Sequence, residues 1–365
     1  MKIAFLGTRG IPANYGGFET FAEQLCVRLA ERGHDVWVYC RRGQYKEHAA
    51  SYRGVRLVHL PSVRRKSLDT LSHTFFSTLH LLGRQADIAY YCNSANSCFA
   101  WLPRLKGVKV ILNTDGLEWE RAKWNWLGKT YYRFSEYLAA LFPNLLVSDS
   151  RAIQSYYKQK FNEDSAYVAY GADIVERGTG RELLAGLGFE PERYFLFVSR
   201  LEPENNAHLV VKAFEQVKTD MKLLIVGSAP FADAYIRELK STTDQRILFP
   251  GALYGDIYTA LRANAYVYIN AMEVGGTHPA ILEAMGAGNC VLVSDIIYNE
   301  EAVADTGVTF KNKDVEDLRK KMQWLADNSP AVERYRSVAV ERVRTVYNWD
   351  RVTDEYERIF SQLLG

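Results

Sequence analysis

Two glycine pairs stand just before helical patterns in the chain. Gly16-Gly17 precedes a helix that we expect from Phe18 onward, and Gly275-Gly276 precedes one that we expect to begin near Pro279. Glycines in this position let a ligand reach backbone N–H groups at the positive end of the helix dipole. A diphosphate fits such a site, whereas a flexible turn is the simpler interpretation of either pair alone.

Polar residues surround the second glycine pair. Glu273 precedes the loop, and Glu283 lies about one turn inside the helix expected from Pro279. Because carboxylates only accept hydrogen bonds, they suit diols. We expect Glu273 to bind sugar hydroxyls and Glu283 to bind ribose, although each alone fits a solvated surface charge. Thr277 and His278 complete the loop, with His278 either a catalytic base or a loop residue that offers its backbone N–H.

Two further candidates follow apolar runs in the second half of the chain. Arg200 follows Tyr194–Ser199, where its guanidinium group can hold a phosphate through two parallel hydrogen bonds. Tyr254 follows Arg246–Pro250 and is our candidate for the neighbourhood of a nucleotide base. An exposed arginine and a packed surface aromatic are the alternatives.

Asp115 follows the apolar run Lys109–Asn113. Ligands of open α/β sheets bind at the carboxyl ends of strands. A carboxylate there can orient or deprotonate an acceptor hydroxyl. A turn formed by Asp115-Gly116 without a chemical role is the alternative.

Aromatic and cationic residues alternate after Asp115. Such a surface fits anionic lipid headgroups or a lipid-linked phosphate acceptor, and we assign Arg121, Lys123 and Trp124 to this acceptor or membrane side. A helix with inward tryptophans and solvated cations is the alternative. The residues are Trp119, Arg121, Lys123, Trp124, Trp126, Lys129 and Arg133, with a second basic cluster at Arg64-Arg65-Lys66.

Short apolar runs alternate with helical patterns along the whole chain. The runs are continuously apolar, which is typical of parallel strands covered on both faces, and the alternation predicts doubly wound α/β units. We expect strands at Lys2–Gly7, Asp35–Cys40, Arg56–Leu60, Asp87–Cys92, Lys109–Asn113, Leu145–Ser148, Ala166–Ala169, Tyr194–Ser199, Lys222–Gly227, Arg246–Pro250, Ala265–Ile269 and Cys290–Ser294.

Length indicates two domains, because the chain has 365 residues and single domains rarely exceed about 200–250. The strand pattern restarts at Tyr194 after a polar, glycine-containing stretch. We therefore expect a Rossmann-like domain over 1–173, a linker over 174–193 and a second Rossmann-like domain over 194–349.

Composition narrows the function classes. A net charge of only +2 gives no reason to expect a nucleic-acid partner. The chain contains no D-x-D triplet and no zinc-like His/Cys spacing, so we expect a metal-independent reaction without a cofactor. It shows no secretory signal and no run of about 18 apolar residues, which favours a cytoplasmic location.

A dinucleotide site is the main rival for the first glycine loop. Gly7-x-x-Gly10 is not the G-x-G-x-x-G pattern, and the second strand is followed by Arg41-Arg42 rather than by an acidic residue for ribose. Because arginines can meet a 2′-phosphate, an NADP enzyme remains an alternative.

Taken in order, four segments resemble glycosyltransferase family 4 and, within it, bacterial rhamnosyltransferases. Tyr347-Asn348-Trp349 before a terminal helix also fits, and the resemblance spans nearly the whole chain. The four segments are Asn14-Tyr15-Gly16-Gly17-Phe18-Glu19-Thr20, Asn113-Thr114-Asp115-Gly116-Leu117-Glu118-Trp119, Arg200-Leu201-Glu202-Pro203-Glu204-Asn205-Asn206 and Val274-Gly275-Gly276-Thr277-His278-Pro279.

This resemblance implies a GT-B fold, with two Rossmann-like doubly wound domains facing a cleft that binds the donor. It implies that a terminal helix over 350–365 completes the first domain and that the reaction is retaining. By resemblance, Arg200 binds the diphosphate, Glu283 the ribose and the region of Glu273 the donor sugar, while Gly16-Gly17 completes the phosphate cradle.

Two positions depart from the family pattern. The family has two acidic residues eight positions apart, whereas Gly275 stands at the first of these positions here and Glu273 precedes it. The phosphate-binding lysine usual after the arginine is replaced by Asn205-Asn206. Backbone N–H donors must then supply more of the diphosphate binding, and we expect Asn205 or Asn206 to contribute a side-chain amide.

We therefore expect a hexosyltransferase for cell-surface polysaccharide, with Asp115, Arg200 and Glu273 as catalytic residues. The favoured donor is dTDP-rhamnose, and the expected acceptor is a saccharide or a polyprenyl-linked saccharide at an anionic membrane surface, on the inner face of the plasma membrane. A sugar-nucleotide epimerase, an NADP-dependent reductase and a non-catalytic nucleotide-sugar-binding protein are the alternatives.

Overall fold

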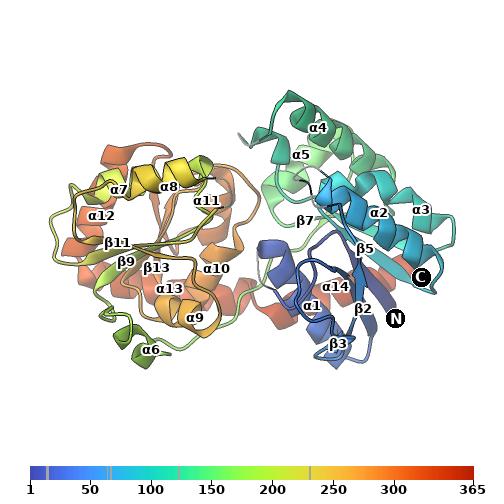
Figure 1. The fold of residues 1–365 in the computed structure, drawn as a ribbon, viewed down its shortest axis with the longest axis horizontal. Helices are drawn as coiled ribbons and strands as arrows, with labels where there is room; N and C mark the ends of the chain where they lie inside the picture. Colours follow the sequence, from blue (N-terminus) through green and yellow to red (C-terminus); the bar gives the residue numbers. More distant parts are fainter. Residues whose placement is uncertain (14–15, 64, 66–67, 122–123, 230–231) are drawn as a thin grey trace. The chain divides into compact units, whose positions relative to one another are not determined.

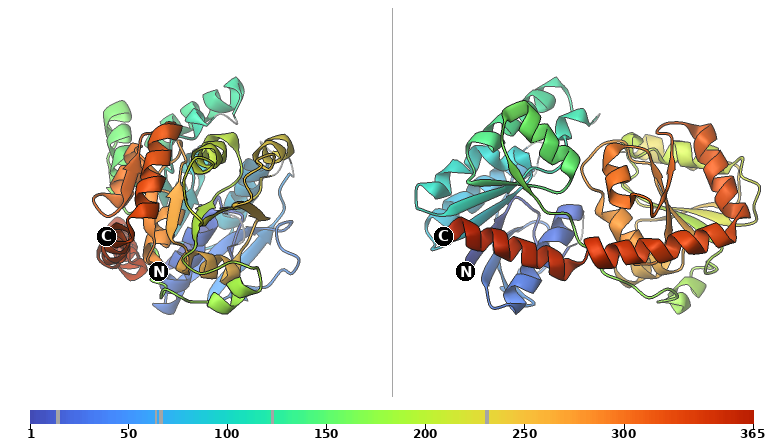
Figure 2. Two further views of the ribbon diagram at one scale, coloured as in Figure 1. Left: turned by 90° about the vertical axis from the view of Figure 1, so that its left-hand side faces the viewer. Right: turned by 180° about the vertical axis from the view of Figure 1, so that it is seen from behind.

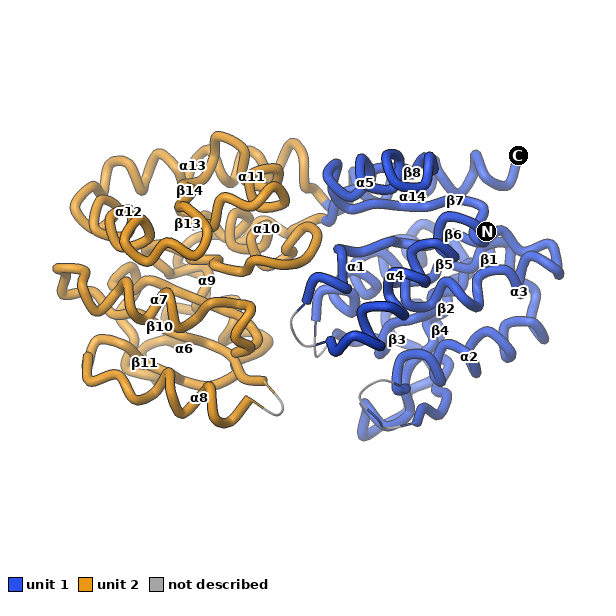
Figure 3. Tube along the Cα trace, turned by 90° about the horizontal axis from the view of Figure 1, so that it is seen from above, with its two compact units in different colours: residues 1–170, 349–365 blue, residues 171–348 orange. Residues whose placement is uncertain are grey.

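The chain folds into two compact α/β units in a computed structural model. Unit 1 comprises Met1–Tyr170 and Trp349–Gly365, and unit 2 comprises Gly171–Asn348 (Figures 1 and 3). Each unit is a largely parallel sheet with helices on its faces, which confirms the predicted fold class. The structure describes residues 1–13, 16–63, 65, 68–121, 124–229 and 232–365.

The sheet of unit 1 has the strand order β3-β4-β2-β1-β5-β6-β7-β8. All neighbouring strands run parallel except β3, which pairs antiparallel with β4. The inner strands β1, β2, β5, β6 and β7 are largely buried because their runs are apolar on both faces. Their bounds are β1 (Lys2–Leu6), β2 (Asp35–Arg41), β3 (Ser51–Tyr52), β4 (Val55–Leu60), β5 (Ile88–Cys92), β6 (Lys109–Asn113), β7 (Leu145–Ser148) and β8 (Ser165–Tyr167).

Helix α14 (Trp349–Leu364) belongs to unit 1, although it follows unit 2 along the chain. It is strongly amphipathic, and its buried stripe packs beside α1 (Gly17–Glu31) (Figure 2). The other helices of this unit are α2 (Asp69–Leu82), α3 (Trp101–Arg104), α4 (Trp126–Leu141) and α5 (Arg151–Phe161), with short turns η1 (Ser94–Phe99) and η2 (Glu118–Glu120).

Unit 2 has a fully parallel sheet in the order β11-β10-β9-β12-β13-β14. Its strands are β9 (Tyr194–Val198), β10 (Lys222–Val226), β11 (Ile247–Gly251), β12 (Val267–Asn270), β13 (Cys290–Ser294) and β14 (Val308–Phe310). Its helices are α6 (Arg181–Ala185), η3 (Pro203–Asn205), α7 (Ala207–Phe214), α8 (Asp233–Leu239), α9 (Gly255–Ala263), α10 (Pro279–Gly286), α11 (Ile297–Val303), α12 (Val315–Asp327) and α13 (Ser329–Val346).

The stretch 174–193, which we expected to be a linker, is placed inside unit 2 and contains α6. Its backbone is tied to that unit, because Val175 N donates to Gly286 O over 3.0 Å. Arg177 also forms an ion pair with Glu192 at 3.2 Å. The polar composition of this stretch therefore reflects a surface segment held by hydrogen bonds and ion pairs.

Each sheet places its first strand in the interior. β1 lies between β2 and β5, and β9 lies between β10 and β12, so the connections leave the first strand in opposite directions. Loops diverge at the carboxyl ends of such strands, which is where open α/β sheets bind ligands.

Candidate functional site

The loops that follow β9 and β10 meet closely at the carboxyl edge of unit 2. Gly227 follows β10 with φ +146°, and a Cβ added there would lie 1.8 Å from Ser199 O. Only glycine fits this approach, which brings the loop containing Arg200 against its neighbour. We did not predict a role for Gly227, although a glycine ending an apolar run is a signal that sequence analysis can use.

The loop after β12 is anchored to the same edge. Asn206 Nδ2 donates to Ala271 O over 2.9 Å, and Ser294 Oγ donates to Met272 O over 2.9 Å. The chain therefore joins the carboxyl ends of β9, β12 and β13 through side-chain hydrogen bonds. This places Arg200 and the second glycine pair in loops that are tied together.

His278 fixes the second glycine loop at the start of α10. Its Nδ1 lies 2.9 Å from Asn299 Oδ1, and its Nε2 lies 3.4 Å from Val274 O. The ring is 9% exposed. Gly275 has φ +147°, and a Cβ there would lie 2.9 Å from His278 Nε2. Of the two roles that we considered for His278, this geometry supports the loop residue.

Helix α10 begins at Pro279, as expected, and it presents Glu283 one turn further on. Glu283 Oε2 lies 2.7 Å from Arg262 Nη1 and accepts from the Tyr258 hydroxyl over 3.3 Å. The Arg262 guanidinium stacks 4.2 Å from the centre of the Tyr258 ring. Both contacts of the Glu283 carboxylate use one oxygen, and they fix its orientation.

Glu273 and Arg200 both keep part of their side chains exposed. Glu273 forms an ion pair with Lys313 and keeps 18% of its side chain exposed. The Arg200 side chain is 34% exposed, with its Nη1 at 3.7 Å from Glu202 Oε2, a weak pairing. Tyr254 precedes α9 with its side chain largely exposed.

The expected role of Asn205 and Asn206 requires correction. Both are buried, and Asn205 Nδ2 donates to Arg200 O over 2.6 Å while Asn206 Nδ2 donates to Ala271 O. Their amides therefore shape the loops instead of facing a ligand. The asparagines that stand in place of the family's lysine form hydrogen bonds within the loops.

The first glycine loop is held by two carboxylates of α1. Gly16 is the N-cap of that helix with an extended backbone, and Gly17 is its first residue. Glu19 Oε1 accepts from Arg9 N over 2.9 Å, and Glu23 Oε2 accepts from Ala13 N over 2.6 Å. Burial raises the pKa of Glu19, against the lowering effect of this backbone bond. Sequence analysis included Glu19 in a motif but gave it no role.

Asp115 lies just beyond β6 with a left-handed backbone, at φ 57°. Its Oδ2 accepts from Asn93 Nδ2 over 3.0 Å, and its backbone N donates to Asn113 Oδ1 over 2.9 Å. Burial raises its pKa to about 6, the charge of Glu118 adds to this effect and Arg121 opposes it. A carboxylate with such a pKa can accept a proton near neutral pH.

Arg121 requires a second correction. We assigned Arg121 to an acceptor or membrane surface, whereas it is buried with its Nε 3.1 Å from Glu118 Oε1. Trp124 Nε1 donates to Glu118 Oε2 over 3.3 Å, which turns this ring toward the same carboxylate. Both residues therefore belong to the surroundings of Asp115. Lys123 lies outside the described residues.

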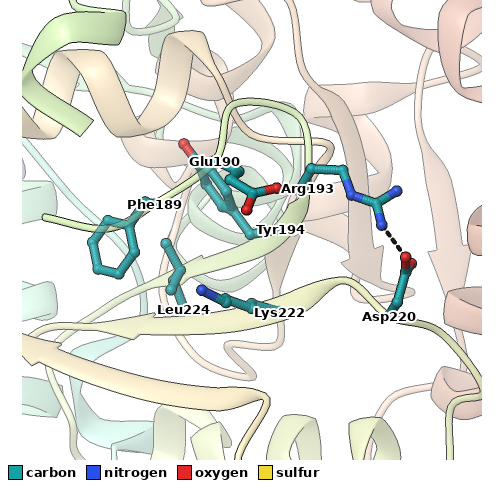
Figure 4. Close-up of a pocket in the computed structure, with 7 residues that line it drawn as sticks. All are labelled: Phe189, Glu190, Arg193, Tyr194, Asp220, Lys222 and Leu224. Atoms are coloured by element: carbon teal, nitrogen blue, oxygen red, sulfur yellow. Dashed lines mark hydrogen bonds and ion pairs between the residues drawn. The ribbon is translucent and has the colours of Figure 1, made fainter. Parts of the chain in front are cut away.

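A pocket of about 230 Å³ lies elsewhere in unit 2 (Figure 4). Arg193 forms an ion pair with Asp220 at its rim, and Tyr194 and Lys222 begin β9 and β10. It therefore lies at the amino ends of the strands, opposite the glycine loop. In the described part of the chain, no three His, Cys, Asp or Glu side chains gather as a metal site would require, and no helix is long and apolar enough to cross a membrane.

Two family models and a curated relative match this chain. Residues 192–328 match the family model described as Glycosyl transferases group 1, and residues 1–71 and 73–173 match a Domain of unknown function, DUF1972. The chain is 20% identical over 380 residues to an uncharacterized glycosyltransferase of Methanocaldococcus jannaschii, MJ1069, covering 96% of each protein.

Solved structures share the whole architecture. The Anabaena protein HepE, solved in complex with UDP, is 18% identical with a TM-score of 0.77, and the match covers 99% of this chain and 100% of that one. Sucrose-phosphate synthase from Thermosynechococcus elongatus is 17% identical with a TM-score of 0.83, covering 99% and 98%. The match of residues 192–328 to Glycosyl transferases group 1, together with the glycosyltransferase relative and the shared fold, supports a glycosyltransferase with the GT-B fold.

Proposed function

We propose that the chain transfers a glycosyl group from a nucleoside diphosphate sugar held by unit 2. The observation that carries this proposal is the fixed loop at the start of α10, where His278 orders Gly275 and Arg262 orients Glu283. Backbone N–H groups at the helix N-terminus suit a diphosphate, and the Glu283 carboxylate suits ribose hydroxyls. Arg200 adds positive charge, and Tyr254 offers a face to the base.

The same residues supply the main catalytic effect. As the sugar leaves, negative charge develops on the diphosphate, and preorganised N–H donors together with Arg200 stabilise it more than they stabilise the bound donor. Asp115 of unit 1 orients the acceptor hydroxyl and receives its proton. We propose retention at the sugar carbon, as the resemblance implies, with Glu273 binding the transferred sugar.

We favour dTDP-rhamnose as donor and a saccharide or lipid-linked saccharide of cell-surface polysaccharide as acceptor. The complex of HepE with UDP makes a uridine donor the second candidate. A melting-temperature screen against UDP, dTDP, GDP and their sugars identifies the base, and transfer assays with the best donor identify the sugar. Binding without hydrolysis or transfer would instead indicate a nucleotide-sugar-binding protein.

The structure removes Arg41, one of the two arginines on which the NADP alternative rested, whereas Arg42 is exposed. Arg41 is buried, its Nη1 lies 2.5 Å from Asp69 Oδ2 and its Nη2 donates to Thr70 Oγ1 over 3.0 Å. The hydrogen-bonding groups of this guanidinium are therefore used within unit 1 and are not available to a 2′-phosphate. NADPH is expected to leave the melting temperature unchanged, and a clear upward shift would restore the reductase interpretation.

We further propose that unit 1 docks on an anionic membrane through α2, α3 and α4. Elements α2 and α3 pack together, and both α2 and α4 pack on η1. Cations, including Lys129 and Arg133 on α4, accompany the apolar side chains, as an anionic interface requires. The exposed apolar residues are Leu68, Phe75, Phe76 and Leu79 on or beside α2, Trp101 and Leu105 on or beside α3, and Trp126, Leu127, Phe134, Tyr137 and Leu141 on α4.

Replacing Leu127 and Phe134 together by Asp is expected to reduce binding to phosphatidylglycerol vesicles at least 10-fold at low salt, because charged side chains resist entry into the interface. Vesicle co-sedimentation measures the effect. Ile297→Asp, at an exposed apolar residue of unit 2, serves as the matched control. Equal binding by the double variant and the wild type, or no binding by the wild type, would reject the docking surface.

A further inference from the structure

The turn that carries Asp115 is strained and held by two asparagines. Asn93 and Asp115 both have a positive φ, at 72° and 57°. Such backbones are strained for residues other than glycine and persist where the surroundings fix them. Asn93 holds the carboxylate, and Asn113 Oδ1 holds the backbone N–H of Asp115. The position of the carboxylate therefore depends on how firmly Asn113 is held.

Asn113 is held in turn by two tyrosines. Its Nδ2 donates to the Tyr90 hydroxyl over 3.2 Å, and the Tyr90 hydroxyl lies 2.9 Å from the hydroxyl of Tyr356. All three side chains are fully buried. A continuous line of hydrogen bonds thus runs from Tyr356 on α14 to the backbone of Asp115. Because a buried polar group without a partner destabilises the fold, each link favours this one arrangement.

Aromatic packing fixes the direction of both hydroxyls. The Tyr90 ring stacks on Phe5 at 4.8 Å between centroids, and the Phe21 ring lies 5.8 Å from Tyr90 and 5.7 Å from Tyr356. Phe21 lies on α1, against which α14 packs. The rings leave little rotational freedom, so a displacement of α14 would move the Tyr356 hydroxyl away from Tyr90.

We infer that the C-terminal helix sets the position of Asp115, with Tyr356, Tyr90 and Asn113 as positioning residues for the acceptor side of the reaction. This inference rests on the proposed role of Asp115. In this proposal α14 both packs on unit 1 and positions a catalytic side chain. The segment that leaves unit 2 after α13 supplies the last link in the support of a catalytic carboxylate.

Tyr356→Phe and Tyr90→Phe test the inference. Each removes one hydroxyl and keeps the ring, so we expect kcat to fall at least 10-fold while the KM for donor stays within twofold. Hydrogen–deuterium exchange of the peptide that contains Asp115 is expected to accelerate at least 10-fold. The acid limb of the kcat profile is expected to shift, because the turn no longer holds the carboxylate in one environment.

Tyr91→Phe is the matched control, because it removes a buried hydroxyl from the adjacent residue of the same strand. The Tyr91 hydroxyl lies 2.8 Å from Thr78 Oγ1 on α2 and takes no part in the line to Asp115. We expect it to lower stability without changing exchange at Asp115 or the acid limb. Equal changes in all three variants, or unchanged exchange in Tyr356→Phe, would overturn the inference.

The exchange measurement needs no substrate, so the inference and the proposed function can fail separately. Accelerated exchange in Tyr356→Phe together with normal turnover in Asp115→Asn would leave the line of hydrogen bonds in place and remove the catalytic role of Asp115. Unchanged exchange in Tyr356→Phe together with lost turnover in Asp115→Asn would keep the catalytic role of Asp115 and reject the positioning role of the tyrosines.

Discussion

Asp115→Asn is expected to lower sugar transfer by about 10²–10⁴-fold while donor affinity stays unchanged. Asparagine tolerates the left-handed backbone at this position and can still accept from Asn93 Nδ2. The substitution therefore removes the proton acceptor and keeps the turn. Transfer kinetics and calorimetric titration with the donor measure the two effects on the same preparation.

The raised pKa of Asp115 adds a pH dependence with a definite sign. Burial, with Glu118 second, raises this pKa from 3.8 to about 6. Transfer is therefore expected to fall as the pH drops through about 6, because the proton acceptor becomes protonated. Between about pH 4 and 6 the folded chain keeps a proton that the unfolded chain has released, so stability falls as the pH rises through that window.

Asp115→Asn is consequently expected to unfold less readily than the wild type above pH 6. The gain is about 3 kcal/mol at pH 8 and vanishes below about pH 4, because the rise in pKa from 3.8 to about 6 spans roughly two units and each unit corresponds to about 1.4 kcal/mol. Urea unfolding at both pH values measures it. Glu118→Gln is the companion variant, and its acid limb is expected to move to lower pH, since the Glu118 charge helps to raise the pKa of Asp115. Near-normal turnover in Asp115→Asn would reject the role.

Patterns within single segments predicted most of the fold. Continuously apolar runs located the buried strands, because parallel strands covered on both faces carry few polar residues. The two-residue β3 and the three-residue β14 were missed, since such short strands show no run. The stretch 174–193 was interpreted as a linker because its pairing with Gly286 and neighbouring loops lies far away in sequence.

The candidate site was predictable where one loop and one helix form it, as at Gly275 and Glu283. The hydrogen-bond and ion-pair partners that come from other helices and loops were not predictable, although they determine the orientation and burial of each site side chain. Arg262 orients Glu283, and Glu118 draws Arg121 into the interior. Sequence alone assigned Arg121 to an acceptor or membrane surface, because a charged residue among tryptophans shows no sign of a buried partner.

The second large effect is expected from Gly275→Ala, which should lower donor affinity about 100-fold, or on the order of 3 kcal/mol. A Cβ there would lie 2.9 Å from His278 Nε2, and φ is +147°, where side chains are strained. His278 cannot easily move aside because Asn299 holds its other nitrogen. The loop must therefore shift, which turns its N–H groups away from the diphosphate. Calorimetric titration with the preferred donor measures the loss.

A double variant separates the collision with His278 from backbone strain. In the His278→Ala background the added methyl group meets no ring, so Gly275→Ala should cost less donor affinity than it does alone, and the difference measures the contact. Gly188→Ala is the control for strain, because Gly188 has φ +71° and a Cβ there would meet nothing within 4 Å. We expect that control to lose about 1 kcal/mol of stability and no donor affinity. Full donor affinity in Gly275→Ala would show that the diphosphate binds elsewhere.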